Sequence, residues 1–399
     1  MEPIYLDYNA TTPVDPLVVE ELLPYLREGF GNPSSSHPYG RKAKEGVETA
    51  RKRVAALLGC EPTEVVFTSG GTEANNQALI GTAMANRDRG NHIITSSIEH
   101  PAVLNPLRWL EKQGFAVTYL PVDTTGLIDP EELRQAITDQ TILISVMHAN
   151  NEVGTIQPLA EIGAIARERG ILLHTDAAQS VGKIPTRVDE LRVDLLSIAG
   201  HKLYAPKGVG ALYVRRGVKI DPYLHGAGHE GGRRAGTENV PYMAALGKAA
   251  ELAAERLATE SERILTLRER FHSRLQELAG DVLLNGHPTS RLPNTLNVSF
   301  AGVNGAELLA RTPEISASTG SACHDGSCEL SGVLKAMGTS LEQGFGAVRL
   351  SLGRLTTAEE VDRAAEIIAA RVKELRGIRG GITHNHQQTG LSALASCAG

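Results

Sequence analysis

Two short apolar runs, each followed by polar residues, constrain this chain more than any other feature. Residues 171–173 are followed by Asp176, and residues 193–199 by a Gly-His-Lys tripeptide that ends at Lys202. Such runs are typical of strands buried on both faces of a parallel sheet. Ligands of open α/β sheets bind outside the carboxyl ends of the strands, so a carboxylate and an amine can meet there.

Asp176 and Lys202 are the pair of groups that pyridoxal phosphate needs. The anion keeps the pyridine nitrogen protonated, so that the ring acts as an electron sink, and the amine forms a Schiff base. The alternative is a buried aspartate and a surface lysine that never meet. The two runs alone leave both interpretations open.

The composition favours a small substrate over a nucleic acid or a membrane surface. The 399 residues suffice for two domains, or for one large domain with a smaller appendage. A net charge of −6 without a basic block argues against nucleic acid or an anionic membrane as partner. Neither a basic, apolar leader nor an apolar run of about 18 residues is present, so we expect a cytoplasmic protein. Four cysteines are too few for a disulfide framework.

Strands alternate with helical stretches between residues 65 and 214, which predicts a mostly parallel sheet with right-handed crossovers. After the strand 65–68, a glycine turn at Gly71 and Thr72 opens a helix. Backbone N–H groups and the helix dipole stabilise a phosphate at such a position. A tight turn without a ligand is the alternative.

Two further strands place polar side chains at the same sheet edge. His100 follows the strand 92–97, and Asn151 follows the strand 141–147. The imidazole either caps the next helix or stacks on an aromatic ligand and moves protons. The Asn151 amide can bind a cofactor oxygen.

The flanking segments complete the expected organisation. We expect a strand at 4–8, helices at 16–27 and 42–58 and a polar loop at 29–40. A glycine-rich loop at 226–239 precedes a long helix at 240–278, and the domain boundary is placed near residue 250. Two strands follow, at 293–300 and 349–352. The last expected helix starts with the capping box at 357–360 and ends before Gly377. The polar tail 378–399 is expected to be a loose terminus.

Taken together, these motifs resemble the cysteine desulfurases of the NifS/IscS type, which belong to the class V aminotransferase-like, fold-type I pyridoxal phosphate enzymes. The resemblance covers residues 4 to 376. The segments that carry it are YLDYNATTP, FTSGGTEANN, SSIEHPAV, HANNEVGTIQP, HTDAAQ, GHKLYAPKG, GTEN and VRLSLGR.

The resemblance implies a homodimer with one pyridoxal 5'-phosphate site per chain. A large domain (15–250) with a mostly parallel sheet would bind the cofactor, and residues 1–14 and 251–377 would form a smaller α+β domain. The resemblance implies that Lys202 provides the covalent amine, Asp176 contacts the pyridine nitrogen and His100 stacks on the ring. The phosphate would be bound by Gly71, Thr72, His201 and, across the dimer, Thr237, and the ring hydroxyl region by Asn151 and Gln179. The substrate would be bound by Arg354, at its carboxylate, and by Asn151.

Cys323 matches the nucleophile of this family, which converts cysteine to alanine and holds the sulfur as a persulfide for an acceptor protein. It lies in a Ser/Gly-rich segment, where we expect a mobile, exposed thiol, and His324 favours its thiolate. A small structural cysteine is the alternative. Cys323 and Cys328 form a C-x4-C pair that offers a disulfide, but two ligands make no zinc site, so no metal is expected.

Ala199 departs from the family pattern, which has a serine that touches the phosphate at this position. Ala199 and the segment ACH-D-G around Cys323 also resemble selenocysteine lyase. Three alternatives to desulfuration therefore stay open: selenocysteine lyase, an aminotransferase, and a cofactor-containing scaffold for a sulfur-acceptor protein.

Overall fold

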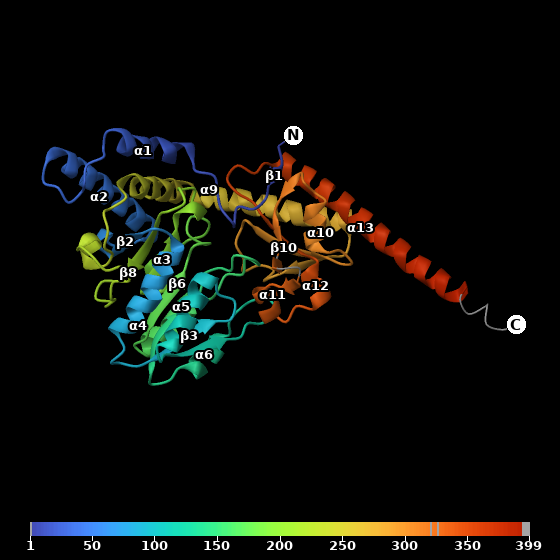
Figure 1. Cartoon of the computed structure of the whole chain (residues 1–399), viewed down its shortest axis with the longest axis horizontal. Helices are drawn as coiled ribbons and strands as arrows, with labels where there is room; N and C mark the ends of the chain where they lie inside the picture. The colour runs from blue at the N-terminus through green and yellow to red at the C-terminus, as the bar shows by residue number, and fades with distance from the viewer. Residues whose placement is uncertain (1, 320, 325–326, 393–399) are drawn as a thin grey trace.

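One long helix, α9 (Val240–Ala279), runs between two bodies of packed elements, and the C-terminal half of the last helix, α13 (Ala358–Ser392), projects away from them (Figure 1). The computed structural model describes residues 2–319, 321–324 and 327–392. The first half of α9 packs in the core of the larger body and its second half in the core of the smaller one. The helix is unbroken, so a domain boundary near residue 250 stays a prediction.

The larger body is built on a seven-stranded sheet with the order β2-β8-β7-β6-β5-β3-β4. All strand pairs are parallel except those made by β8, which is antiparallel to both neighbours. The mostly parallel α/β sheet is confirmed. The strands are β2 (Val65–Thr68), β3 (His92–Ser96), β4 (Ala116–Leu120), β5 (Thr141–Ser145), β6 (Leu172–Asp176), β7 (Leu195–Ala199) and β8 (Gly210–Val214).

Helices cover both faces of this sheet because successive strand side chains point to opposite faces. Ile93 packs in one core and its neighbour Ile94 in the other. One core receives α2 (Pro38–Leu58), α7 (Leu159–Glu168) and α9, and the other receives α3 (Gly71–Asn76), α4 (Thr82–Ala85) and α5 (Pro101–Lys112). The shorter helices α1 (Pro16–Arg27), α6 (Pro130–Ala136) and α8 (Val188–Leu191) complete this body.

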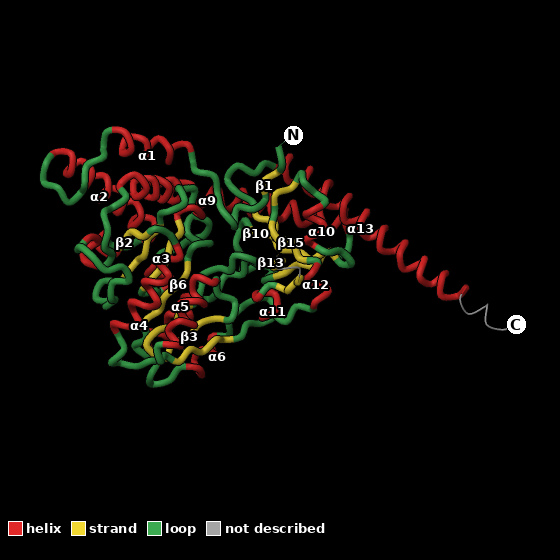
Figure 2. Tube along the Cα trace, viewed as in Figure 1, coloured by secondary structure: helices red, strands yellow, loops and turns green. Residues whose placement is uncertain are grey.

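The smaller body contains a four-stranded antiparallel sheet with the order β12-β15-β10-β9 (Figure 2). Its strands are β9 (Val282–Asn285), β10 (Thr295–Phe300), β12 (Ser318–Thr319) and β15 (Ala347–Ser351). Its helices are α10 (Gly305–Ala310), α11 (Gly332–Ala336), α12 (Leu341–Phe345) and the first half of α13. Within the described ranges, no helix is both long and apolar enough to cross a lipid bilayer.

Two predicted boundaries near the N-terminus were wrong. The first strand, β1 (Ile4–Tyr5), is shorter than expected and pairs with β11 (Ile315–Ser316). The helix α2 begins four residues early, at Pro38, because the ring of His37 accepts a hydrogen bond from the backbone N–H of Gly40 and caps the helix. A histidine cap is harder to read from sequence than Ser, Thr, Asp or Asn.

Two expected loops are regular structure. The backbone around Cys323 forms a hairpin of β13 (Ser321–His324) and β14 (Ser327–Leu330), in which Cys323 pairs in register with Cys328. The tail was expected to be loose, but α13 continues through Gly377 to Ser392. No proline interrupts this stretch, and each glycine costs only about 1 kcal/mol relative to alanine, so composition alone does not end the helix.

Candidate active site

A pocket of about 400 Å³ lies where the main-sheet strands end and α3 begins. Residues that follow β3, β5, β6 and β7 form its walls, as expected at the carboxyl edge of an open α/β sheet. Eight predicted site residues line it: Gly71, Thr72, His100, Asn151, Asp176, Gln179, His201 and Lys202. The side chains of Asp176 and Lys202 therefore meet in one pocket.

Lys202 ends a short 3-10 turn, η3 (Gly200–Lys202), that directly follows β7. Its amine donates hydrogen bonds to the backbone carbonyls of Asn9 and Ala10, the latter at 2.6 Å. Burial, helped by the charge of Arg349 and opposed by nearby carboxylates, lowers the pKa of Lys202 to about 8. An amine with this pKa is still mostly protonated near pH 7, but a far larger fraction of it is neutral, and so nucleophilic, than for an ordinary lysine.

Asp176 is the last residue of β6, and only 7% of it is exposed. One carboxylate oxygen accepts a 2.7 Å hydrogen bond from the side-chain amide of Asn75, and the other accepts a 2.9 Å bond from the backbone N–H of Ala178. These donors hold the carboxylate in a fixed orientation at the pocket wall. An ionised carboxylate only accepts hydrogen bonds, so it suits a protonated ring nitrogen.

Glu99, which the sequence interpretation did not single out, is fully buried beside this carboxylate. Burial raises the pKa of Glu99 to about 8, against the opposing effect of hydrogen bonds from Ser96 and from the backbone of Met147. The charge of Asp176 raises the pKa of Glu99 further. Glu99 is therefore mostly protonated at neutral pH, which leaves Asp176 as the carboxylate that faces the pocket. An acidic residue directly after a buried strand was the available signal.

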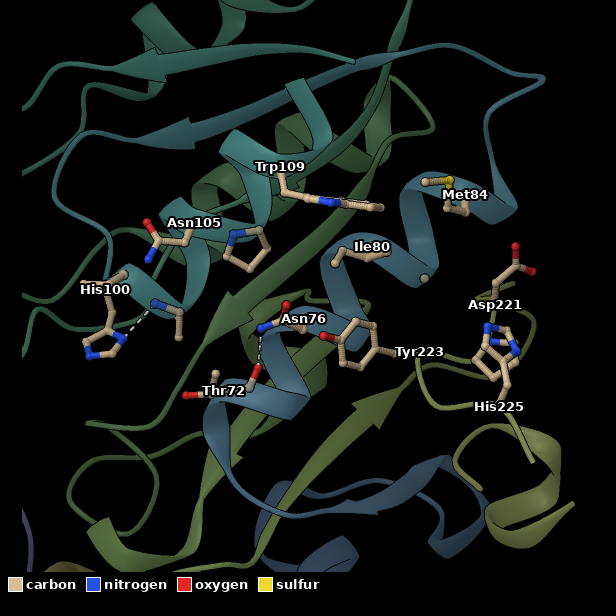
Figure 3. Close-up of a pocket in the computed structure, with 15 residues that line it drawn as sticks. Thr72, Asn76, Ile80, Met84, His100, Asn105, Trp109, Asp221, Tyr223 and His225 are labelled. Carbon is tan, nitrogen blue, oxygen red and sulfur yellow. Dashed lines mark hydrogen bonds between the residues drawn. The ribbon is translucent and has the colours of Figure 1, made fainter. Parts of the chain in front are cut away.

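His100 is the N-cap of α5 and lines both this pocket and the adjoining cleft drawn in Figure 3. Its Nδ1 accepts a 3.0 Å hydrogen bond from the backbone N–H of Ala102, so the proton of the neutral ring sits on Nε2. The pKa of His100 is lowered, chiefly by desolvation. The charge of Asp176 raises this pKa, and the charge of Lys202 lowers it. The capping and ligand-stacking roles are therefore compatible, because the cap uses a ring edge and leaves the ring faces free.

The start of α3 meets the end of β7 at the opposite side of the pocket. A Cβ on Gly71 would lie only 3.1 Å from the Cβ of Ala199, closer than ordinary van der Waals contact, so a larger residue there would have to displace its neighbour. The first N–H groups of a helix have no intrahelical acceptor, so Gly71 and Thr72 can present them to an anion. His201 lies nearby, and burial, with the charges of Lys202 and a second lysine, lowers its pKa to about 4. Its ring is therefore neutral.

Asn9, in the N-terminal segment, connects the pocket residues to both bodies. Its backbone carbonyl accepts a 2.9 Å hydrogen bond from Gln179 Nε2 as well as the bond from Lys202. Its side-chain amide donates to Thr295 Oγ1 at 2.8 Å and to the backbone carbonyl of Asn151 at 3.1 Å. Asn9 is 1% exposed and was not predicted as a site residue.

Arg349 and Arg354 lie five residues apart in the segment VRLSLGR, but only Arg349 is among the described residues that line the pocket. Arg349 donates to the carboxylate of Asp7 at 2.8 Å and to the carbonyl of Asn151 at 3.1 Å. Its Nε is buried and has no partner among the described residues.

Arg354, the residue expected to bind the substrate carboxylate, lies outside this pocket but near Lys202, because both residues line a separate small cavity of about 30 Å³. It forms ion pairs with Asp15 at 2.6 Å and Glu260 at 2.8 Å, and its guanidinium lies 4.2 Å from the centre of the Tyr204 ring. The structure therefore brings Arg349, rather than Arg354, to the pocket. The two arginines are equivalent by residue type, and only their tertiary contacts separate them.

Besides Arg354, two further predicted residues are not placed in the pocket. Thr237 is exposed and lies outside the described lining of this pocket. For Cys323 only the backbone strand is described, and its side chain lies outside the described part of the chain.

A second, more open cleft of about 850 Å³ adjoins the first, because Thr72, His100 and Ala102 line both. Figure 3 shows Thr72 and His100 at one end of this cleft, with Trp109 and Tyr223 along it. Trp109 is 42% exposed and Tyr223 is 40% exposed. Large aromatic side chains are thus accessible beside the pocket mouth.

Comparisons with known proteins agree with this architecture. The family model of the class-V aminotransferases matches residues 4–364. The chain belongs to the class-V aminotransferase family. A cysteine desulfurase IscS from Methanosarcina thermophila is 54% identical over 377 residues, which cover 94% of this chain and 93% of the relative.

Solved structures support the same placement. A NifS-like protein superposes with a TM-score of 0.86 at 40% identity, over 95% of this chain and 99% of that one. SspA, solved in complex with cysteine, superposes with a TM-score of 0.77 at 39% identity, over 87% of this chain and 98% of that one. The resemblance to NifS/IscS-type cysteine desulfurases and the fold-type I architecture are confirmed.

Proposed function

We propose that the protein is a pyridoxal phosphate-dependent cysteine desulfurase, which converts L-cysteine to L-alanine and holds the sulfur as a persulfide on Cys323. The observation that carries the proposal is the meeting of Lys202, Asp176 and Arg349 in one pocket. An amine, a carboxylate and a guanidinium there match a carbonyl cofactor with a basic ring and an amino-acid substrate. The relatives named cysteine desulfurase supply the reaction class.

The residues present fit pyridoxal phosphate. The pocket of about 400 Å³ has a neutralisable amine at one side, a fixed carboxylate at another and the glycine-opened start of α3 at a third. Lys202 would hold the cofactor covalently, Asp176 would contact the pyridine nitrogen, and the backbone of Gly71 and Thr72 would hold the phosphate. His100 would stack on the ring.

When bound, pyridoxal phosphate supplies the electron sink that makes the substrate Cα–H bond acidic. The neutral amine of Lys202 would act as the general base that takes the proton from the substrate Cα. Its pKa of about 8 suits both roles, because the amine can be neutral when it attacks and when it accepts the proton.

We assign the substrate carboxylate to Arg349 in place of Arg354. The buried Nε of Arg349 has no partner among the described residues, and its other nitrogens are held by Asp7 and Asn151. A fixed guanidinium with a spare donor suits a carboxylate. Asn151, whose carbonyl holds Arg349, lies beside the same position.

The sulfur step assigned to Cys323 is redox-neutral. Its thiolate attacks the sulfur of the substrate, so an S–S bond forms and the C–S bond breaks. The carbon fragment takes up protons and leaves as alanine, and Cys323 keeps the sulfur as a persulfide. Both strands of the hairpin that carries Cys323 belong to the C-terminal part of the chain, whereas Lys202 lies in the turn that follows β7 of the large sheet.

The proposal includes a homodimer and a sulfur-acceptor protein in the cytoplasm. Thr237 is exposed and outside the described lining of its own pocket, so its phosphate contact would need a second copy of the chain. The exposed Trp109 and Tyr223 beside the pocket mouth supply apolar area for that copy to bury. The scarcity of cysteines favours a reducing compartment.

The deciding experiment compares alanine formation from L-cysteine and from L-selenocysteine by the chain loaded with pyridoxal phosphate. We expect alanine from cysteine together with a protein persulfide. Selenocysteine lyase is the second candidate, favoured by Ala199 at the pocket wall, and turnover of selenocysteine alone would establish it. Amino-group exchange with a keto acid would indicate an aminotransferase. If neither amino acid is turned over, the remaining alternative is a cofactor-containing scaffold for a sulfur-acceptor protein.

A further inference from the structure

Lys183 is a partly buried lysine beside the pocket that the proposed mechanism does not use. It lies on the turn after β6, and its amine donates to Gln179 Oε1 at 2.9 Å and to Asn9 Oδ1 at 3.3 Å. No ion pair to a carboxylate is found for it among the described residues. Burial, helped by the charges of Lys202 and Arg349, lowers the pKa of Lys183 to about 7. Burying an amine without a counter-ion is costly, so its bonds to the pocket residues call for an explanation.

Lys183, Gln179 and Asn9 form a closed set of three hydrogen bonds. Lys183 donates to the side-chain oxygens of both partners, and Gln179 Nε2 donates to the backbone carbonyl of Asn9 at 2.9 Å. The same carbonyl accepts a hydrogen bond from Lys202. Gln179, Asn9 and Lys202 line the pocket, whereas Lys183 is absent from its described lining.

This arrangement fixes the orientation of the Gln179 amide. The two ends of an amide have nearly the same shape, so hydrogen-bond partners decide which end points where. A backbone carbonyl only accepts, so the Asn9 carbonyl takes one hydrogen of Nε2, and Lys183, which has N–H donors whether charged or neutral, donates to Oε1. The second hydrogen of Nε2 is left for a ligand in the pocket, which must present an acceptor oxygen there.

We infer that Lys183 is a positioning residue for the cofactor: through Gln179 and Asn9 it presents an N–H donor to the ring hydroxyl oxygen of pyridoxal phosphate and holds the carbonyl that faces Lys202. The inference rests on the proposed function, because pyridoxal phosphate is the ligand. Without Lys183, Gln179 Oε1 is buried without its donor and the amide loses one of the two contacts that fix it.

The test is a titration of the apo-protein with pyridoxal 5'-phosphate, followed by the visible absorbance of the lysine-bound cofactor. We expect Lys183→Met to weaken cofactor binding roughly tenfold, the scale of one hydrogen bond, and to shift the absorbance maximum. Lys183→Arg, which keeps donor-only chemistry, should restore much of the affinity. Lys248→Met, at a partly buried lysine on α9 paired with Glu251, is the matched control and should bind like the unaltered chain.

A double-mutant cycle separates positioning from a general structural role. If Lys183 acts through Gln179, Lys183→Met should add less than threefold in a Gln179→Ala background. An additive loss, or unchanged affinity and spectrum in Lys183→Met, would overturn the inference. Should Lys183→Met unfold, Lys183→Gln keeps an N–H donor in a shorter side chain and serves in the same cycle. Failure of the unaltered chain to bind pyridoxal 5'-phosphate would instead reject the proposed function.

Discussion

Arg349 donates a 2.8 Å hydrogen bond to the carboxylate of Asp7, and this ion pair fixes an arginine of β15 at the wall of the pocket. Both side chains are largely buried, with 11% of Arg349 and 19% of Asp7 exposed. The pair therefore ties the N-terminal segment to the C-terminal sheet at the position where we place the substrate carboxylate.

Replacing each of the two neighbouring arginines should have different consequences. Arg349→Ala should lower kcat/KM for cysteine by 10- to 150-fold, because charge-assisted hydrogen bonds worth about 1.5–3 kcal/mol are lost. Arg354→Ala should instead destabilise the fold by about 3 kcal/mol, because Asp15 is left buried without its main partner. Steady-state kinetics and thermal unfolding of both variants check this. A selective kinetic defect in Arg354→Ala with a stable fold would return the carboxylate to Arg354.

The amine of Lys202 should capture the cofactor most rapidly above pH 8. Capture needs the unprotonated amine, and the pKa of Lys202 is lowered to about 8, chiefly by burial. The rate should therefore rise with pH and level off above about 8, as followed by stopped-flow absorbance of the apo-protein mixed with pyridoxal 5'-phosphate. A half-maximal rate near 10.5, the usual pKa of lysine, would contradict the assigned environment.

Lys202→Ala should abolish the visible absorbance of the lysine-bound cofactor, because no amine is left at this position to bind it. Lys207→Ala, at an exposed lysine five residues further along the chain, should retain this absorbance. Retained absorbance in Lys202→Ala would mean that another amine binds the cofactor.

Asp176→Asn should permit capture of the cofactor but remove most turnover. A neutral amide cannot stabilise the protonated pyridine nitrogen, and its own N–H₂ group competes with the 2.7 Å donation from Asn75. We expect at least a 100-fold loss in kcat, on the order of 3 kcal/mol, measured as alanine formation with the cofactor content determined in parallel. Near-normal turnover would exclude Asp176 as the ring partner.

Cys323→Ser should lose alanine formation from cysteine and keep measurable formation from selenocysteine. Selenium leaves carbon more readily than sulfur, so its elimination needs less help from an attacking thiolate. Cys60→Ser is the control, because burial raises the pKa of Cys60 to about 12 and keeps its thiol protonated. Cofactor absorbance should be unchanged in both variants. Equal loss of both activities in Cys323→Ser would indicate thiolate attack on either substrate.

Ala199→Ser should strengthen cofactor binding by about 1 kcal/mol, or roughly fivefold in Kd. Ala199 lines the pocket next to Gly71, so a hydroxyl on its Cβ would lie beside the start of α3, where the phosphate is placed. Equilibrium titration of both forms with pyridoxal 5'-phosphate measures the change. Weaker or unchanged binding would show that other groups already satisfy the phosphate.

Much of the pocket could be predicted from the sequence because parallel strands end at one edge of a sheet. His100, Asn151, Asp176 and Lys202 each follow a short apolar run, so the order of strands along the chain was enough to bring them together. The α/β class followed from the same alternation.

The sequence could not decide which of two residues of the same type lies in the pocket, and it could not reveal contacts between residues far apart along the chain. Arg349 and Arg354 differ because Asp7 holds one and Asp15 holds the other, and both aspartates lie more than 330 residues away. The hairpin at Cys323 and the extended α13 were likewise missed, because composition reports propensity and not the pairing a segment finds. The sequence thus determined which chemical groups reach the sheet edge, because the end of a strand is marked by the residues next to it. Only the tertiary structure decided the partners and the pKa values of Lys202, Lys183 and Glu99, because burial and nearby charge depend on residues distant in sequence.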